Sequence, residues 1–128
     1  MKLLLDTCSF LWITNAQSEL SSGARAAFED EANETYLSVV SAWEIAIKNG
    51  LRNLPLPEPA QLFLPNARAL HKIVSLSLNE DAIVQLPHLP LLHRDPFDRM
   101  LICQAIAEGM AIVTPDELIR RYPVRTIW

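Results

Sequence analysis

Short apolar runs that alternate with helical patterns most constrain the fold of this chain. The first run, KLLLD at residues 2–6, has only leucines between its lysine and its aspartate. A continuous apolar run of this length is typical of a strand buried on both faces, as in a parallel sheet. Further strand-like runs, rich in β-branched or aromatic residues, follow at 35–41, 73–78, 111–114 and 124–128.

Helical patterns fill the spaces between these runs. We expect one helix to begin at residue 7, and further helices at 18–34, 42–50, 60–72, 79–86, 96–109 and 116–121. Pro65 is expected to break or kink the helix at 60–72. Strands that alternate with helices predict an α/β fold with a mainly parallel sheet of four or five strands, covered by helices on both faces. No linker interrupts the pattern, so we expect a single domain over residues 1–128.

Composition excludes some classes of function. The net charge of −4 argues against a protein that holds nucleic acid mainly by neutralising phosphates, although it leaves room for a nuclease that carries divalent metal. No stretch approaches the roughly 20 apolar residues that span a bilayer, so we expect a cytoplasmic protein. Cys8 and Cys103 lie in apolar runs and are expected to be buried, reduced thiols, and no Cys/His cluster indicates a zinc site.

Acidic residues follow the predicted strands. Asp6 ends the first run, Glu44 lies just beyond the second, and Asp116 follows the fourth with Thr114 beside it. Parallel α/β sheets carry their sites at the carboxyl ends of strands. Each acid also has a structural alternative: Asp6 and Asp116 as helix caps, and Glu44 as the partner of Ser41 in a capping box.

The motif HRDPFDR carries two further carboxylates. Pro96 suits the first position of a helix, which makes Asp95 the expected N-cap and puts Asp98 in the first turn. Asp98 heads a stripe with Ile102 and Ala105 at helical spacing. We therefore predict a structural role for Asp95 and a functional role for Asp98.

Taken together, the four acids Asp6, Glu44, Asp98 and Asp116 favour a metal site. Unpaired carboxylates at close range repel one another, and Mg²⁺ or Mn²⁺ with oxygen ligands relieves that repulsion. Such a site suits phosphodiester hydrolysis, because the metal activates water for attack on phosphorus.

Four segments in this order resemble the PIN-domain ribonucleases, and most of all the VapC-type toxins of bacterial toxin–antitoxin pairs. They are LLLDT, SVVSAWEIAIK, HRDPFDRMLICQA and AIVTPDE, and together they extend over nearly the whole chain. The resemblance implies a three-layer α/β/α PIN-like fold. One departure is Cys8, where close relatives often carry histidine, and it puts substrate contacts in doubt more than metal binding.

The resemblance also implies a function. It assigns the catalytic and metal-binding roles to Asp6, Glu44 and Asp98, with Asp116 as a more variable fourth acid. The implied activity is Mg²⁺- or Mn²⁺-dependent endoribonuclease cleavage of RNA. The implied partners are a second copy in a homodimer and a VapB-like antitoxin that covers the active site in a hetero-oligomer.

Thr114, Arg99 and His93 are the candidate substrate contacts. Arg99 follows Asp98 and suits a phosphate contact, with an arginine at the edge of the core as the alternative. His93 suits an RNA contact, with a surface loop histidine as the alternative. Lys48 is expected to pair with Glu44 as an i,i+4 couple.

Two other classes of protein stay open as alternatives. One is another Mg²⁺-dependent phosphoesterase, but a haloacid dehalogenase phosphatase needs a DxD pair where this chain has DTC, and the acidic pair and lysine of a receiver domain are missing. The other is a non-catalytic interaction domain whose acids are caps and whose apolar surface includes Trp12, Trp43 or Trp128. Metal binding separates this reading from the enzyme.

Overall fold

Five parallel strands form one sheet in the order β3-β2-β1-β4-β5. The computed structural model describes residues 1–128. The strands are β1 (Lys2–Leu5), β2 (Glu34–Ser38), β3 (Val74–Leu76), β4 (Ala111–Val113) and β5 (Thr126–Ile127). The predicted parallel sheet is therefore confirmed, with β1 at its centre.

Six α-helices and two 3₁₀ turns connect the strands. The helices are α1 (Thr7–Thr14), α2 (Ser22–Glu29), α3 (Val39–Gly50), α4 (Ala60–His71), α5 (Glu80–Ile83) and α6 (Pro96–Glu108). The 3₁₀ turns are η1 (Leu86–His88) and η2 (Ile119–Arg121). No helix is both long and apolar enough to cross a membrane.

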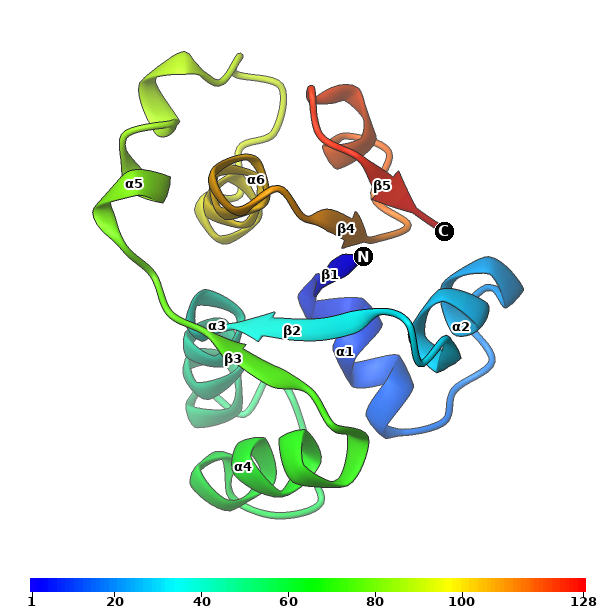
Figure 1. Ribbon diagram of the computed structural model, residues 1–128. Coiled ribbons are helices and arrows are strands. Elements are labelled where there is room, and N and C mark those ends of the chain that lie inside the picture. Colours follow the sequence, from blue (N-terminus) through cyan, green and yellow to red (C-terminus); the bar gives the residue numbers. More distant parts are fainter.

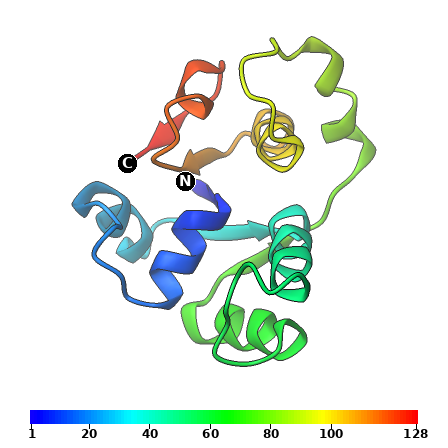
Figure 2. The same cartoon turned by 180° about the vertical axis from the view of Figure 1, so that it is seen from behind.

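The sheet separates two hydrophobic cores, which confirms the three-layer arrangement. Leu3 and Leu5 of β1 face a core that includes Phe10 and other residues of α1, α2 and α4. Leu4 points to the opposite face, into a core with Ile102 and other residues of α6. Alternation along a strand sends successive side chains to opposite faces, so the KLLLD run is buried on both sides. α1 lies behind β2 in Figure 1 and in front of it in Figure 2.

The boundary between β2 and α3 differs from the predicted one. The strand ends at Ser38 rather than at residue 41, because the Ser38 hydroxyl caps α3 by accepting the N–H of Val40 at 3.0 Å. Val40 then packs in the core beside α6. The predicted capping box of Ser41 and Glu44 is wrong: both lie inside α3, and the buried Ser41 hydroxyl has no hydrogen-bond partner.

Three helical segments also differ from their predicted form. α2 is shorter than 18–34 because Ser21, not Ser18, caps it, by accepting the N–H of Ala24 at 3.0 Å. Residues 116–121 form only the 3₁₀ turn η2. Pro65 lies inside α4 without interrupting it, at the cost of one backbone donor.

Candidate active site

A cavity of about 320 Å³ lies at the carboxyl edge of the sheet, where β1 and β4 end and where α1, α3 and α6 begin or pass. It is lined by Asp6, Thr7, Cys8, Glu44, Lys48, Asp95, Asp98, Pro115 and Asp116. All four acids singled out in the sequence thus face one cavity, together with the carboxylate of Asp95. Lys48 is the only basic residue among them, so the cavity is strongly negative when its acids are ionised.

Asp6 follows β1 directly and has two contacts of different kinds. Its Oδ1 accepts the N–H of Ser9 at 2.8 Å and so caps α1. Its Oδ2 accepts a hydrogen bond from the Thr114 hydroxyl at 2.5 Å, which links Asp6 to the end of β4. Burial raises the pKa of Asp6 and outweighs these hydrogen bonds, which act to lower it. The predicted cap is therefore present, and the same side chain lines the cavity.

Glu44 enters the cavity from the middle of α3. Its Oε1 accepts a hydrogen bond from the Thr7 hydroxyl at 2.6 Å, and its Oε2 lies 2.6 Å from the Lys48 ammonium nitrogen. The predicted i,i+4 pair is confirmed. The hydrogen bond to Glu44 raises the pKa of Lys48, so the lysine stays charged and fixes the carboxylate.

Asp98 lies in the first turn of α6, where Asp95 caps the helix as predicted. The Asp95 Oδ1 accepts the N–H groups of Phe97 at 2.8 Å and of Asp98 at 3.2 Å. Ile102 and Ala105, below Asp98 on the same stripe, are buried. Burial, and next the negative charge of Asp95, raise the pKa of Asp98 to about 7. A carboxyl group held in this way is half protonated near neutral pH unless a cation compensates it.

Asp116 lines the cavity beside Asp98, and the His93 side chain contacts both acids. The His93 Nε2 lies 2.9 Å from Asp116 Oδ2 and 3.1 Å from Asp98 Oδ2. Partial burial acts to raise the pKa of Asp116, but the hydrogen bond from His93 and the N–H of Leu118 outweigh it, and the pKa is lowered. His93 is buried, so the expectation of a surface loop histidine is wrong; the Tyr122 hydroxyl accepts its N–H at 2.8 Å and draws the loop inward.

The acids fall into two sets within the cavity. Atoms of His93, Asp98 and Asp116 that can bind a metal all lie within 4.8 Å of one another. Asp6 and Glu44 line the same cavity, but their oxygens are held by the hydroxyl groups of Thr114 and Thr7 and by other donors. The sequence predicted the convergence of the acids at one sheet edge but not this subdivision.

Three further residues singled out in the sequence, Arg99, Cys103 and Cys8, lie in different surroundings. Arg99 donates through Nη1 to the Pro90 carbonyl at 3.1 Å and to the Tyr122 hydroxyl at 3.2 Å, which places it at the margin of the core. Cys103 is buried as expected, whereas Cys8 is exposed, because it projects from the first turn of α1 toward the cavity. Desolvation of its thiol, with the charge of Asp6, raises the pKa of Cys8 to about 11, so it is not a thiolate at neutral pH.

Sequence reasoning missed two residues that organise the site. Thr7 bonds Glu44, and its position immediately after Asp6 at a strand end was the available signal. Tyr122 accepts hydrogen bonds from the N–H groups of Leu92 and His93 through its hydroxyl. No local pattern marked Tyr122, because Leu92 and His93 are 30 and 29 residues away from it in the chain.

The donor set fits a hard divalent cation. Carboxylate and hydroxyl oxygens dominate the cavity, and such ligands suit Mg²⁺ and Mn²⁺. Burial raises the pKa of Asp6 and of Asp98, so a nearby cation would favour the ionised form of both carboxylates. Cys8 supplies the only sulfur atom among the lining side chains.

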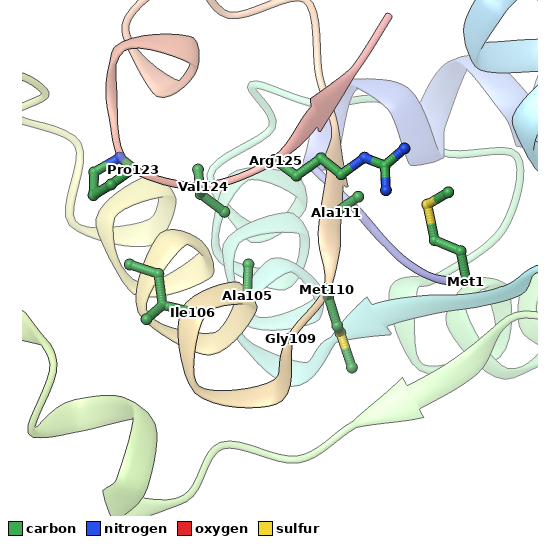
Figure 3. A pocket seen from close by; sticks show the side chains of 9 residues that line it. All are labelled: Met1, Ala105, Ile106, Gly109, Met110, Ala111, Pro123, Val124 and Arg125. Atoms are coloured by element: carbon green, nitrogen blue, oxygen red, sulfur yellow. The ribbon is translucent and has the colours of Figure 1, made fainter.

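A second cavity of about 330 Å³ lies at the opposite, amino edge of the sheet (Figure 3). It is lined by Met1, Ala105, Ile106, Gly109, Met110, Ala111, Pro123, Val124 and Arg125. These residues include no acid, and Arg125 is the only charged side chain among them. This cavity offers no carboxylate ligands for a hard cation.

Comparisons with known proteins agree with this fold. The PIN domain family matches the chain over residues 3–124. Ribonuclease VapC16 of Mycobacterium tuberculosis strain H37Rv is 48% identical over 42 residues, which span 33% of this chain and 30% of that relative.

Solved structures of VapBC proteins share the fold at low sequence identity. VapBC2 from Rickettsia felis, bound to a DNA fragment from its promoter, matches with a TM-score of 0.74 and 17% identity, covering 98% of this chain and 97% of that chain. DNA-bound VapBC from Salmonella typhimurium matches with a TM-score of 0.69 and 18% identity, over 98% and 96% of the two chains. VapBC-1 from nontypeable Haemophilus influenzae matches with a TM-score of 0.63 and 14% identity, again over 98% and 96%.

Proposed function

Because the chain belongs to the PIN domain family, we propose that it is a metal-dependent endoribonuclease and the toxin of a toxin–antitoxin pair. One observation carries the proposal: five carboxylates and a single lysine line one cavity at the carboxyl edge of a parallel sheet. The partial likeness to Ribonuclease VapC16 supports RNA as the substrate. The likeness to VapBC structures supports the role in a toxin–antitoxin pair.

The proposed ion is Mg²⁺ or Mn²⁺, and its proposed ligands are Asp6, Glu44, Asp98 and Asp116. A bound ion of this kind supplies positive charge to the scissile phosphate and activates water for attack on phosphorus.

Neighbouring side chains hold these ligands. Thr114 orients Asp6 by donating to its Oδ2, and Thr7 and Lys48 hold the two oxygens of Glu44. Asp95 keeps the structural role of a helix cap. Thus two of the four proposed ligands are fixed by donors on other turns or elements before any ion binds, which lowers the entropic cost of ordering them.

RNA would reach the cavity against an unfavourable charge. The chain carries −4 overall and the cavity is acidic, so phosphate neutralisation by basic side chains cannot dominate binding there. Thr114, Arg99 and His93 are the proposed substrate contacts, as the sequence predicts. Of these, Thr114 and His93 bond directly to acids of the cavity.

We propose a VapB-like antitoxin and a second copy of the chain as protein partners. An apolar stripe runs along α3 beside the acids and consists of Val39, Trp43, Ile47 and Leu51, all exposed. Trp43 is 61% exposed and packs against Phe97 of α6 in a T-shaped contact at 5.0 Å. Contiguous exposed apolar surface of this kind is typical of protein interfaces. Here Trp43 directly precedes Glu44, and its contact Phe97 directly precedes Asp98.

RNA cleavage tests the enzymatic proposal. The purified protein is incubated with a mixed RNA pool and Mn²⁺, with and without EDTA, alongside Asp98→Asn and Asp95→Asn. We expect cleavage that EDTA abolishes, that Asp95→Asn retains, and that Asp98→Asn reduces by more than the 10–100-fold typical of changes outside the ligand shell.

Other outcomes would contradict parts of the proposal. Cleavage that persists in EDTA or in Asp98→Asn would remove the metal-site assignment. Loss of cleavage in Asp95→Asn alone, with the fold retained, would reverse the roles of the two acids. No cleavage combined with no Mn²⁺ binding would favour the non-catalytic interaction domain.

A further inference from the structure

His93 lies between two of the proposed metal ligands and bridges two elements of the fold. Asp98 belongs to the first turn of α6, and Asp116 follows β4 in the loop before η2. The His93 Nε2 is 3.1 Å from an oxygen of Asp98 and 2.9 Å from an oxygen of Asp116. By distance alone, His93 qualifies as a metal ligand with these two acids.

The hydrogen bond at the other ring nitrogen, Nδ1, excludes His93 as a metal ligand. The backbone N–H of Asp95 donates to the His93 Nδ1 at 3.1 Å. A ring nitrogen that accepts a hydrogen bond carries no proton, so the proton of the neutral ring is on Nε2. Nε2 therefore donates to the two carboxylates, and the same N–H bond leaves it no lone pair for a cation.

A backbone hydrogen bond also fixes the position of His93. The His93 N–H donates to the Tyr122 hydroxyl at 2.8 Å, and the same hydroxyl accepts from the N–H of Leu92 at 3.1 Å and from Arg99 at 3.2 Å. The His93 side chain is 11% exposed. Hydrogen bonds at its backbone and at both ring nitrogens hold the imidazole beside the acids.

We propose that His93 is a positioning residue: its Nε2–H holds Asp98 and Asp116 side by side so that both face one divalent cation, without binding that cation itself. Two carboxylates at this separation repel each other when no donor lies between them. Donors outside the ligand shell orient metal-binding carboxylates in this way. The inference rests on the proposed metal site and goes beyond the role of RNA contact predicted from the sequence.

Two amide substitutions separate the two ring nitrogens. In His93→Gln, the terminal amide reaches the region of Nε2 and keeps a donor for the acids. In His93→Asn, the shorter side chain reaches only the region of Nδ1, so it keeps an acceptor for the Asp95 N–H but loses the donor. His88→Asn is the matched control, because His88 is an exposed histidine in η1, outside the cavity.

The readout is Mn²⁺ affinity of the RNA-free protein by calorimetry, with thermal unfolding as a check on the fold. We expect His93→Asn to weaken Mn²⁺ binding by about 10–100-fold, the range for lost outer-shell donors, while His93→Gln keeps most of the affinity. His88→Asn should bind as the wild type does. Electron spin-echo spectroscopy of the Mn²⁺-loaded wild type should show no directly bound imidazole nitrogen.

Three results would overturn the role of His93 while leaving the metal site intact. They are wild-type affinity in His93→Asn, equal losses in the asparagine and glutamine variants with both folded, and a spin-echo signal from a coordinated imidazole. A wild type that binds no Mn²⁺ would instead remove the proposed metal site, and the inference with it.

Discussion

The carboxyl group of Asp98 links the electrostatics of the site to the stability of the fold. Burial and the charge of Asp95 raise its pKa from 3.8 to about 7, so the folded chain binds this proton more tightly than the unfolded chain does. The stability that this group contributes is therefore complete below its ordinary pKa and is lost as the pH rises through about 7. Asp6, whose pKa is also raised, acts in the same direction.

Asp98→Asn should stabilise the metal-free protein at high pH. We expect the wild type in EDTA to lose on the order of 2 kcal/mol of unfolding free energy through this group between about pH 5.5 and pH 8, because its folded pKa is about 7. The variant lacks this loss, so it should be the more stable protein at the higher pH. Urea unfolding at both pH values measures the difference. A variant less stable than the wild type at about pH 8 would show that Asp98 has a stabilising structural role.

His93 marks the limit of prediction for single residues. Asp6, Asp95 and Asp98 were predictable from local signals: Asp6 follows a strand, Asp95 precedes a proline, and Asp98 heads an apolar stripe at helical spacing. The burial of His93 depends on Tyr122, which is 29 residues away in the chain. A loop histidine next to an arginine suggests a surface position, and only the tertiary hydrogen bonds reverse that reading.

The first turn of α6 positions two of the acids, Asp95 and Asp98. Asp95 caps it through two backbone N–H groups, and Pro96 occupies the first position without losing a hydrogen bond. The same turn carries Asp98 into the cavity. A change in the cap should therefore affect helix stability, whereas a change in charge alone should affect the titration of Asp98.

Asp95→Ala and Asp95→Asn should separate the two effects. We expect the alanine variant to lose about 1 kcal/mol of unfolding free energy, and the asparagine variant to keep most of it because asparagine caps helices well. Both variants should lower the pKa of Asp98, since the neighbouring negative charge is gone. Urea unfolding and NMR titration of the Asp98 carboxyl carbon measure the two quantities.

Ser21→Ala provides the control for this pair. Ser21 caps α2 in the same manner but lies outside the acidic cavity, so its loss should lower stability without changing Mn²⁺ affinity. Equal losses of stability in Asp95→Ala and Asp95→Asn would contradict the capping role of Asp95.

The start of α3 shows why element boundaries were harder to predict than elements. Val39 and Val40 favour a strand by propensity, and the sequence therefore extended β2 to residue 41. In the fold, Ser38 caps the helix, its hydroxyl also donates to Gln104 at 2.5 Å, and Val40 packs against α6. Gln104 of α6 is 66 residues from Ser38 in the chain. These contacts with a distant helix outweigh the local propensity for a strand.

At the scale of the whole molecule, the parallel sheet brings distant parts of the sequence into one site. β1 pairs with β2 on one side and with β4 on the other, so Asp6, Ser38 and Thr114 emerge at the same edge. The rule that parallel sheets carry their sites at this edge was sufficient to predict the convergence of the acids. The division of the acids around His93 was not predictable, because it depends on how loops pack rather than on strand order.

The central claim is that these acids form one site for a divalent cation, and calorimetric titration of Mn²⁺ into the RNA-free protein tests it most directly. We predict binding by the wild type, binding at least about tenfold weaker in Asp98→Asn, and unchanged binding in the Ser21→Ala control. The absence of Mn²⁺ binding in the wild type, or equal affinity in the wild type and Asp98→Asn, would contradict the claim.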